Sequence, residues 1–156
     1  RSQKRTLRRN RDLTLEVTCP DSSEETYRLY ERYISERHQD GDMYPPSEQQ
    51  YDDFLASDFG TTAFLKARKN GRLVACMVFD QLEDGLSSVY SFYDPDEQDR
   101  SLGTWLILQA NYLAHGLALP YNYLGYLVHE SKKMAYKRKF VPLDALIDGK
   151  WTLLSP

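Results

Sequence analysis

The sequence has few of the residues that build metal centres and disulfide frameworks. Two cysteines and three histidines occur among its 156 residues. Cys19 and Cys76 lie far apart and lack the spacing of metal ligands, so the sequence predicts neither a disulfide scaffold nor a bound metal. Cys76 falls within the apolar run Leu73–Phe79, which indicates a buried thiol. With no disulfide expected, the default compartment is a reducing cytoplasm.

Long apolar runs are also missing. No run reaches the ~18 apolar residues that a membrane-spanning helix needs, and no signal peptide opens the chain. There is neither an internal repeat nor a low-complexity tract. What remains is the composition of an ordinary globular domain, with 41% hydrophobic and 28% charged residues. The first residue is not Met, so we expect the sequence to be part of a longer protein.

Positive charge is unevenly placed along the chain. The net charge is −3, but residues 1–11 carry six basic side chains and no acid, which leaves −9 on the remainder. A second basic cluster falls near the other end, at Lys132, Lys133, Lys137, Arg138 and Lys139. Two cationic islands on an acidic body are typical of a protein that binds a polyanion. A disordered arm and a solvated helix face are the alternative interpretation.

Hydrophobic periodicity and turn residues predict a mixture of strands and helices. After a basic arm or short helix over 1–12, the expected strands are Leu13–Thr18, Thr61–Lys69, Leu73–Phe79, Leu86–Tyr93, Tyr121–Val128 and Leu143–Ile147. The expected helices are Glu24–Arg37, a short one from Ser47 to Ser57, Leu102–Leu117 and Ser131–Phe140. Ser22 and Glu25 suggest a capping box, and Asn70-Gly71 a tight hairpin. The pattern predicts one α/β (α+β) domain over 13–156, with a mixed, mostly antiparallel sheet flanked by helices.

The segment Ser88–Gly103 carries the clearest chemical signal. A buried strand brings Tyr90 to an acidic turn, and Arg100-Ser101-Leu102-Gly103 then opens an apolar helix. A glycine in the first helical turn lets a ligand approach the backbone. The free amides of a helix N-terminus, with Arg100 beside them, suit a phosphate.

This order of strand, turn, R-x-x-G, apolar helix and strand resembles the donor-binding core of the Gcn5-related N-acetyltransferase fold. In that fold an R/Q-x-x-G-x-G/A loop holds the pyrophosphate of coenzyme A. Here Trp105 occupies the last small position, and its indole would crowd coenzyme A. The resemblance therefore implies the fold with a different donor.

Four blocks of sequence stand out in combination. They are R-H-Q-D-G-D-M-Y-P-P at Arg37–Pro46, Y-S-F-Y-D-P-D at Tyr90–Asp96, R-S-L-G at Arg100–Gly103, and Y-L-G-Y with S-K-K-M-A-Y-K at Tyr123–Tyr126 and Ser131–Lys137. Together they resemble the C-terminal domain of the arginyl-tRNA–protein transferase family, nearest to its bacterial branch, the aspartate/glutamate leucyltransferases. The opening R-S-Q-K-R-x-x-R-R-N is similar to that branch as well, so the resemblance covers essentially the whole chain.

The resemblance implies an aminoacyltransferase. It would move leucine, or arginine in the eukaryotic-type variant, from a charged tRNA to a protein that begins with Asp or Glu, which creates a degradation signal. Charged tRNA is then a co-substrate, acceptor proteins with acidic N-termini are partners, and no cofactor, metal or membrane is implied. The family's own N-terminal domain is expected to lie outside this sequence.

We assign roles to candidate residues as hypotheses. The catalytic candidates are Asp94, which can orient the amine or accept its proton, Tyr90 and Arg100. The candidates for binding aminoacyl-tRNA are Arg100, Ser101, Gly103, Tyr123, Tyr126, Lys132, Lys133 and Lys137, with Phe92 as a further stacking side chain. The candidates for binding the acceptor are His38, Asp40 and Asp42. Structural roles stay open beside these: core packing for the aromatic residues, turn geometry for Asp94 and helix termination for His38.

Three other functions fit parts of the pattern. A coenzyme A-dependent N-acetyltransferase would be protected against heat by acetyl coenzyme A. A non-enzymatic tRNA- or RNA-binding module would bind uncharged RNA without transferring an amino acid. A domain that only recognises protein N-termini would bind peptides independently of tRNA.

Overall fold

The computed structural model describes residues 2–57, 60–128 and 134–154, and the chain divides into two units, Arg1–Tyr123 and Leu124–Pro156. The first unit contains α1 (Ser2–Arg9), β1 (Leu13–Thr18), α2 (Glu24–Arg37), α3 (Glu48–Tyr51), the π-helical turn η1 (Asp52–Ala56), β2 (Thr62–Lys69), β3 (Arg72–Gln81), β4 (Gly85–Tyr93), the 3₁₀ helix η2 (Pro95–Arg100), α4 (Leu102–Gly116) and β5 (Tyr121–Tyr123). The second unit contains the 3₁₀ helix η3 (Ala135–Lys139), β6 (Leu143–Ile147) and β7 (Lys150–Leu154).

A five-stranded sheet in the order β1-β2-β3-β4-β5 forms the centre of the first unit. Neighbouring strands are antiparallel from β1 to β4, whereas β5 pairs with β4 in parallel, through Gly85–Ser87 and Tyr121–Tyr123. This confirms the predicted mixed, mostly antiparallel sheet. Beyond Ser87, the stretch Ser88–Tyr93 of β4 pairs only with β3 among the strands of this unit. About half of its backbone amides and carbonyls therefore face away from a ladder partner.

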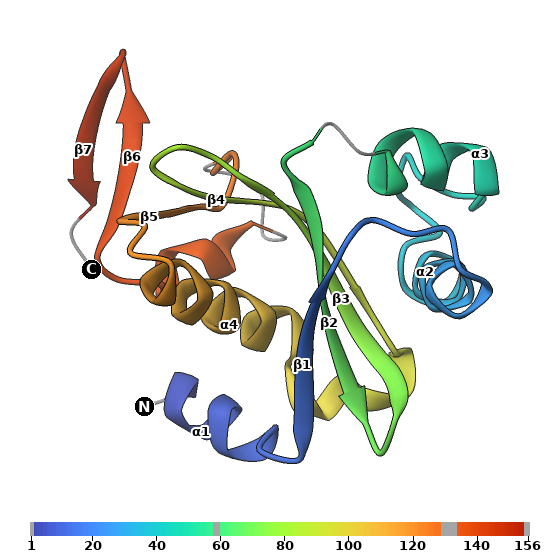
Figure 1. Ribbon diagram of the computed structural model, residues 1–156. Coiled ribbons are helices and arrows are strands. Elements are labelled where there is room, and N and C mark those ends of the chain that lie inside the picture. Colours follow the sequence, from blue (N-terminus) through green and yellow to red (C-terminus); the bar gives the residue numbers. More distant parts are fainter. Residues whose placement is uncertain (1, 58–59, 129–133, 155–156) are drawn as a thin grey trace. The chain divides into compact units, whose positions relative to one another are not determined.

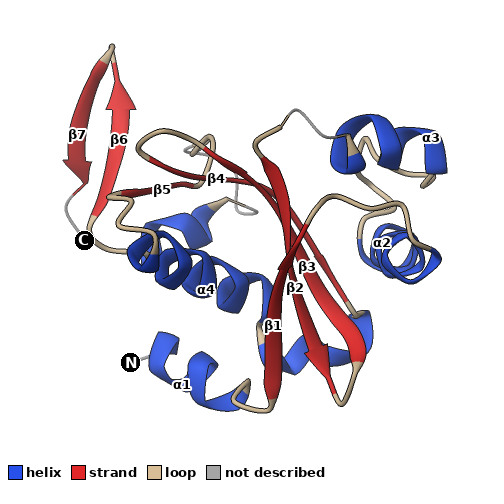
Figure 2. Cartoon of the chain, in the orientation of Figure 1, coloured by secondary structure: helices blue, strands red, loops and turns tan. Residues whose placement is uncertain are grey.

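Helices cover both faces of this sheet, as Figures 1 and 2 show. Helices α2 and α3 lie on one face, and α4 lies on the other with α1 beside it. The core under α2 is largely aromatic, because Tyr30, Tyr51, Phe64 and Phe92 are all fully buried there. Tyr30 and Phe92 meet edge to face, with ring centroids 5.7 Å apart.

Helix α2 has the predicted bounds but a different cap. Ser23 is the N-cap, and its hydroxyl accepts the amide of Thr26 at 3.4 Å. Asp21 accepts both the amide and the hydroxyl of Ser23, which fixes Ser23 in this position. The capping box predicted from Ser22 and Glu25 is therefore wrong.

The hairpin turn predicted at Asn70-Gly71 is confirmed. Asn70 and Gly71 have φ angles of 51° and 84°, and a type I′ turn needs positive φ at both central positions. In the second unit, Asp148 and Gly149 repeat this geometry, with φ angles of 50° and 76°, and join β6 to β7. Each turn places a residue that tolerates the left-handed region next to a glycine.

Two elements predicted in the last third of the chain differ from the structure. The strand predicted over Tyr121–Val128 ends at Tyr123, and residues 124–128 have no regular secondary structure. Gly125 has a φ of 73°, which is incompatible with an extended strand. The helix predicted over Ser131–Phe140 is instead the short 3₁₀ helix η3, and residues 131–133 lie outside the described part.

Candidate functional site

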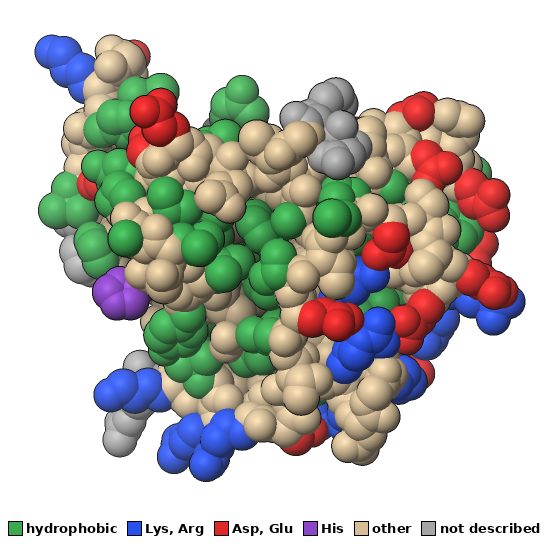
Figure 3. All heavy atoms as spheres, viewed as in Figure 1, with side chains coloured by type: hydrophobic (Ala, Val, Ile, Leu, Met, Phe, Trp, Pro, Cys, Tyr) green, Lys and Arg blue, Asp and Glu red, His purple; other side chains and the backbone are tan. Residues whose placement is uncertain are grey.

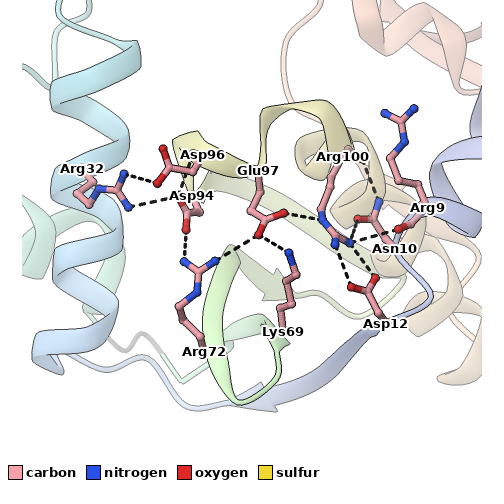
Figure 4. Close-up of polar contacts among 10 residues, drawn as sticks. All are labelled: Arg9, Asn10, Asp12, Arg32, Lys69, Arg72, Asp94, Asp96, Glu97 and Arg100. Carbon is pink, nitrogen blue, oxygen red and sulfur yellow. Dashed lines mark hydrogen bonds and ion pairs between the residues drawn. The ribbon is translucent and has the colours of Figure 1, made fainter.

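The turn that joins β4 to α4 is held by the carboxylate of Asp94. Asp94 is fully buried, and it accepts the amide of Asp96 at 3.0 Å, which caps η2. The same carboxylate forms ion pairs with Arg72 at the start of β3 and, at 3.3 Å, with Arg32 of α2. Figure 4 shows both arginines pointing at Asp94 from these two elements. The turn is thus tied to a helix and to a neighbouring strand.

Asp94 is held in its ionised form. Burial disfavours the charge, but hydrogen bonds from Arg72 and the Asp96 amide, together with the charges of Arg72 and Arg32, outweigh burial and lower the pKa of Asp94 below its ordinary value. A carboxylate with a lowered pKa and occupied oxygens is a weak proton acceptor. This geometry favours a positioning role over removal of a proton from an amine.

Glu97 extends the charged network to Arg100. Its carboxylate accepts from Lys69 at 2.7 Å, from Arg72 at 3.3 Å and from Arg100 at 2.6 Å. Arg100 in turn donates to both carboxylate oxygens of Asp12, at 2.8 and 2.9 Å. Basic and acidic groups alternate along the whole row in Figure 4.

Arg100 is therefore engaged by residues of its own chain. Its side chain is 16% exposed, and it also donates to the carbonyl of Arg9 at 3.2 Å and to the Asn10 side chain at 3.4 Å. Its carboxylate partners, Asp12 before Glu97, raise the pKa of Arg100 above its ordinary value. A phosphate would have to compete with Asp12 for the guanidinium. Phosphate binding by Arg100 stays a prediction, and the contacts themselves are those of a positioning residue.

Five members of this network were not singled out from the sequence: Asp12, Arg32, Lys69, Arg72 and Glu97. Only one local signal pointed to some of them. The hairpin tip Lys69–Arg72 carries two cations, and the turn after β4 carries four acids, among them Asp94, Asp96 and Glu97. These opposite charges fall at adjacent ends of paired strands, where the structure brings them into contact.

The N-cap residue of helix α4 is Ser101, which has a left-handed φ of 55° and makes no side-chain capping hydrogen bond. Its first-turn amides therefore lack the usual side-chain cap. A Cβ on Gly103 would lie 3.4 Å from the ring of Tyr93, so the glycine lets the helix start approach β4 closely. Trp105 lies one helical turn after Ser101, and its apolar indole is buried.

The partly exposed rings of Tyr90 and Tyr93 on β4, with Phe54 of η1, form an aromatic surface that packs against the buried Tyr33 of α2. The ring centroid of Tyr93 lies 4.9 Å from that of Tyr33, and the Arg37 guanidinium lies 5.7 Å from the Tyr93 ring. Tyr90 is half-buried and lies 6.3 Å from Phe54, ring to ring. Burial raises the pKa of Tyr90 to about 12, so its hydroxyl stays protonated at neutral pH.

Phe92 does not belong to this aromatic surface. It is fully buried and packs against Tyr30 and Tyr51 in the core. The prediction that Phe92 can stack on a base is therefore wrong, because its ring has no exposed face.

The predicted acceptor residues lie in the loop that follows α2. The amide of His38 donates to the Ile34 carbonyl at 3.0 Å, and the His38 ring lies 4.7 Å from the Tyr33 ring. This confirms the helix-terminating role of His38. Asp40 and Asp42 are exposed in the same loop, and acceptor binding by the three residues stays a prediction.

An open pocket of about 480 Å³ lies beside Asp94 in the first unit. Its lining mixes arginines with carboxylates: Glu24, Glu25, Arg28, Leu29, Arg32, Arg72, Leu73 and Asp94. Of the predicted site residues, only Asp94 lines this pocket. These charged side chains are engaged in ion pairs, such as Arg28 with Glu24 and Arg72 with Asp94.

The remaining tRNA candidates are divided between the two units. Tyr123 ends β5 and donates its hydroxyl to Asp84 at 2.8 Å. In the second unit, Tyr126 is 87% exposed, and its carbonyl accepts from Lys137. Lys137 is buried, and burial lowers its pKa, so it does not offer the exposed charge that the predicted phosphate track requires. Lys132 and Lys133 lie outside the described residues.

Cysteine behaves as predicted: Cys76 is buried, which raises the pKa of its thiol, and Cys19 is exposed. Within residues 2–57, 60–128 and 134–154, no three His, Cys, Asp or Glu side chains are grouped so that they can hold a metal ion. The same described residues include no helix with the length and hydropathy to span a bilayer.

Comparison with known sequences decides the family. Residues 25–147 match the family described as arginine-tRNA-protein transferase, C terminus. The chain belongs to this family. It is 48% identical, over 99% of its length, to the aspartate/glutamate leucyltransferase of Stutzerimonas stutzeri, and 45% identical, over 97%, to that of Hahella chejuensis. The chain spans 66% and 64% of the length of these two relatives.

Solved structures identify the fold of this transferase-family chain. The ribosomal-protein-alanine N-acetyltransferase from Brucella melitensis biovar Abortus matches with a TM-score of 0.62 at 14% identity, covering 92% of this chain and 98% of that one. A possible acetyltransferase from Clostridium difficile also gives 0.62, at 8% identity and with 92% and 99% coverage. The predicted acetyltransferase-like fold is confirmed, and at such low identity the likeness concerns the fold alone.

Proposed function

We propose that this chain is the catalytic part of a transferase that moves leucine from leucyl-tRNA to the N-terminal Asp or Glu of acceptor proteins. One observation carries the proposal: proteins named aspartate/glutamate leucyltransferase are 45–48% identical to it over at least 97% of its length. The chain spans 57–66% of those relatives, so the proposal concerns the full-length protein. Charged tRNA is the co-substrate, with no further cofactor, and the cytoplasm is the expected compartment.

The chemistry demands little of the protein beyond positioning. The reaction exchanges an ester for an amide, which is downhill without an energy source. The attacking α-amine has an ordinary pKa near ~8, so a useful fraction is neutral in the cell. Holding that amine against the ester carbonyl can supply up to about 7–11 kcal/mol. A hydrogen-bond donor for the tetrahedral oxyanion is then more valuable than a strong base.

Tyr90 is our candidate for that donor. It is half-buried on the stretch Ser88–Tyr93 of β4, which pairs with no described strand of the first unit on its β5 side, and its hydroxyl is protonated at neutral pH. A protonated phenol and nearby backbone amides can both donate to an oxyanion. The ring of Phe54 lies next to Tyr90 and is partly exposed. Its exposed side suits a leucine side chain or a stacked adenine.

Asp94 and Arg100 are proposed as positioning residues rather than groups that touch the reacting atoms. Together they hold η2 and the start of α4 against α2, β3 and β1. The first-turn amides near Ser101 and Gly103 are proposed to receive a phosphate of the tRNA 3′ end.

Further candidates lie in the second unit, at Tyr123 and in the loop after α2. Tyr126, which is largely exposed, is proposed to stack on the RNA, with Tyr123, Lys132 and Lys133 as further candidates. His38, Asp40 and Asp42 are proposed to meet the N-terminus of the acceptor, where a carboxylate can pair with its ammonium group.

The test uses the full-length protein with labelled leucyl-tRNA and arginyl-tRNA. Peptides that begin with Asp, Glu or Lys serve as acceptors. We expect leucine on the Asp and Glu peptides and none on the Lys peptide. Transfer of acetyl groups from acetyl coenzyme A without transfer of any amino acid would overturn the proposal.

A pair of tyrosine variants tests the oxyanion donor separately. Tyr90→Phe should lower kcat by roughly 100-fold, the usual effect of removing one oxyanion donor. Tyr112→Phe, which alters an exposed tyrosine of α4, serves as the matched control and should retain full activity. A Tyr90→Phe enzyme with the parent kcat would remove Tyr90 from this role.

A further inference from the structure

Helix α1 has two chemically opposite faces. Gln3, Thr6, Leu7 and Asn10 follow the i, i+3, i+4, i+7 spacing of one face, and all four are partly or fully buried. This face packs on α4, beside which α1 lies in Figure 1. The opposite face carries four exposed cations: Lys4, Arg5, Arg8 and Arg9. Arg11, just beyond the helix, is exposed as well.

These cations have no acidic partner in the part of the chain that the structure describes. None of them takes part in the ion pairs formed elsewhere in the first unit. Figure 3 shows the Lys and Arg side chains over α1 standing alone, whereas those over α2 are mixed with acidic side chains. Lys4 and Arg8 are like charges at i, i+4, and so are Arg5 and Arg9, a spacing that disfavours a helix. An eight-residue helix that tolerates two such pairs is better suited to a polyanionic partner than to stability alone.

The cationic face is rigidly connected to the start of α4. Asn10 is 2% exposed, and its amide group donates to the carbonyls of Thr6 at 3.0 Å and Arg100 at 2.9 Å. The Arg100 guanidinium donates a hydrogen bond to the carbonyl of Arg9. In Figure 4 the Arg9 side chain points away from this contact and meets none of the residues drawn. The backbone of α1 is therefore fixed at the helix start, while its cations remain available.

We propose that the exposed face of α1, formed by Lys4, Arg5, Arg8 and Arg9, is a docking surface for the phosphate backbone of the tRNA co-substrate. This proposal rests on the proposed function. The surface begins beside the first turn of α4, where the tRNA 3′ end is proposed to bind. Phosphate contacts of this kind fix the register of a nucleic acid without reading its sequence. The acidic remainder of the chain would repel RNA elsewhere, which makes a local cationic face effective.

The experiment compares variants of the full-length protein with its parent. Arg5→Gln/Arg8→Gln removes two exposed charges, Arg5→Lys/Arg8→Lys keeps them, and Lys150→Gln removes an exposed charge of β7. Uncharged tRNA is titrated at several salt concentrations, and leucyl transfer is followed at limiting and saturating leucyl-tRNA. Circular dichroism and urea unfolding check that each variant is folded.

We expect the double Gln variant to bind tRNA at least 10-fold more weakly near 0.1 M salt. The log–log slope of affinity against salt should fall in magnitude by about 1.4–1.8, which corresponds to two lost phosphate contacts. KM for leucyl-tRNA should rise with kcat unchanged, while the double Lys variant and Lys150→Gln behave like the parent. A double Gln variant with the parent's affinity and salt slope would overturn the docking surface while leaving the proposed function standing. A parent that neither binds tRNA nor transfers leucine would overturn both.

Discussion

Asp12 and Arg100 meet through two parallel hydrogen bonds, 2.8 and 2.9 Å long, although 88 residues separate them in the sequence. Asp12 precedes β1 and Arg100 ends η2, so the pair joins the first strand of the sheet to the start of α4. Glu97 holds the other side of the same guanidinium at 2.6 Å. Planar pairing of this type is specific in geometry as well as favourable in energy.

Asp12→Asn separates the two roles that Arg100 can have. If Arg100 positions α4, loss of the carboxylate should lower the melting temperature by about 2–4 °C, the shift that ~1 kcal/mol produces in a domain of this size. The affinity for tRNA should then stay the same or fall. If Arg100 binds a phosphate directly, the released guanidinium should raise that affinity. We expect the first result, with Asp99→Asn as a control because Asp99 is an exposed acid of the same turn.

Two buried tyrosines should respond in opposite ways to loss of their hydroxyl groups. Tyr30 Oη is buried with no hydrogen-bond partner among the described residues, whereas Tyr51 Oη donates to the Asp21 carbonyl at 2.7 Å. Tyr30→Phe removes an unsatisfied polar group, so it should raise the free energy of unfolding by about 1 kcal/mol. Tyr51→Phe should lower it by about 1 kcal/mol. Urea unfolding measures the free energy of unfolding of both variants. If both lose the same amount of free energy, Tyr30 Oη must have a hydrogen-bond partner.

Gly85 sets the point at which β5 joins the sheet. A Cβ there would lie 2.7 Å from the Tyr121 carbonyl oxygen and 2.9 Å from the Tyr123 ring, so β4 and β5 can pair only around a glycine. Gly85→Ala should therefore lower the free energy of unfolding by about 1–3 kcal/mol, as overpacking does.

Gly116→Ala is the matched control for this substitution. Gly116 ends α4 and has nothing within 4 Å of an added Cβ, so the alanine should be neutral or favourable by up to about 1 kcal/mol. Chemical unfolding measures both variants. Similar changes in the free energy of unfolding at Gly85 and Gly116 would show that the close approach to Tyr121 does not exclude a side chain at Gly85.

The parts of the fold that could be predicted are those fixed by neighbouring residues. Asn70-Gly71 determines a hairpin by itself, because both residues accept positive φ, and the strands on either side then pair in register. The helix Glu24–Arg37 follows from its apolar stripe, and its bounds were predicted correctly. The family motifs added the acetyltransferase-like fold, which the solved structures share.

The candidate site was harder to predict because its contacts are distant in sequence. Arg32 and Asp94 lie 62 residues apart, and no spacing rule relates them. The R-S-L-G motif identified Arg100 as a candidate phosphate ligand, but only the fold shows that Asp12 occupies its guanidinium. Likewise, the end of β5 at Tyr123 depends on the backbone of Gly125 rather than on hydrophobic pattern.

The ion pair between Asp21 and Lys66 should make stability depend on pH at the acid end. Lys66 is 4% exposed, and its ammonium group donates to Asp21 and, at 2.9 Å, to the hydroxyl of Thr26. Burial raises the pKa of Asp21, but hydrogen bonds from Lys66, Ser23 and Thr26 outweigh burial and lower it to about 2. Because the folded pKa lies below the unfolded value near ~4, the carboxylate stabilises the fold fully above that value. Its contribution should disappear as the pH falls from about 4 to about 2.

Asp21→Asn removes this dependence and leaves the buried ammonium group of Lys66 without its carboxylate. At pH 6 the variant should unfold with a free energy lower by about 2–3 kcal/mol, in the range for a broken, partly buried ion pair. The gap between parent and variant should narrow steadily below pH 4, because protonation of Asp21 makes the parent resemble the variant. Urea unfolding at pH 6, 4, 3 and 2.5 measures the gap, and Asp99→Asn serves as an exposed control with little difference at any pH. A gap that stays constant down to pH 2.5 would mean that Asp21 contributes through its neutral hydrogen bonds to Ser23 rather than through its charge.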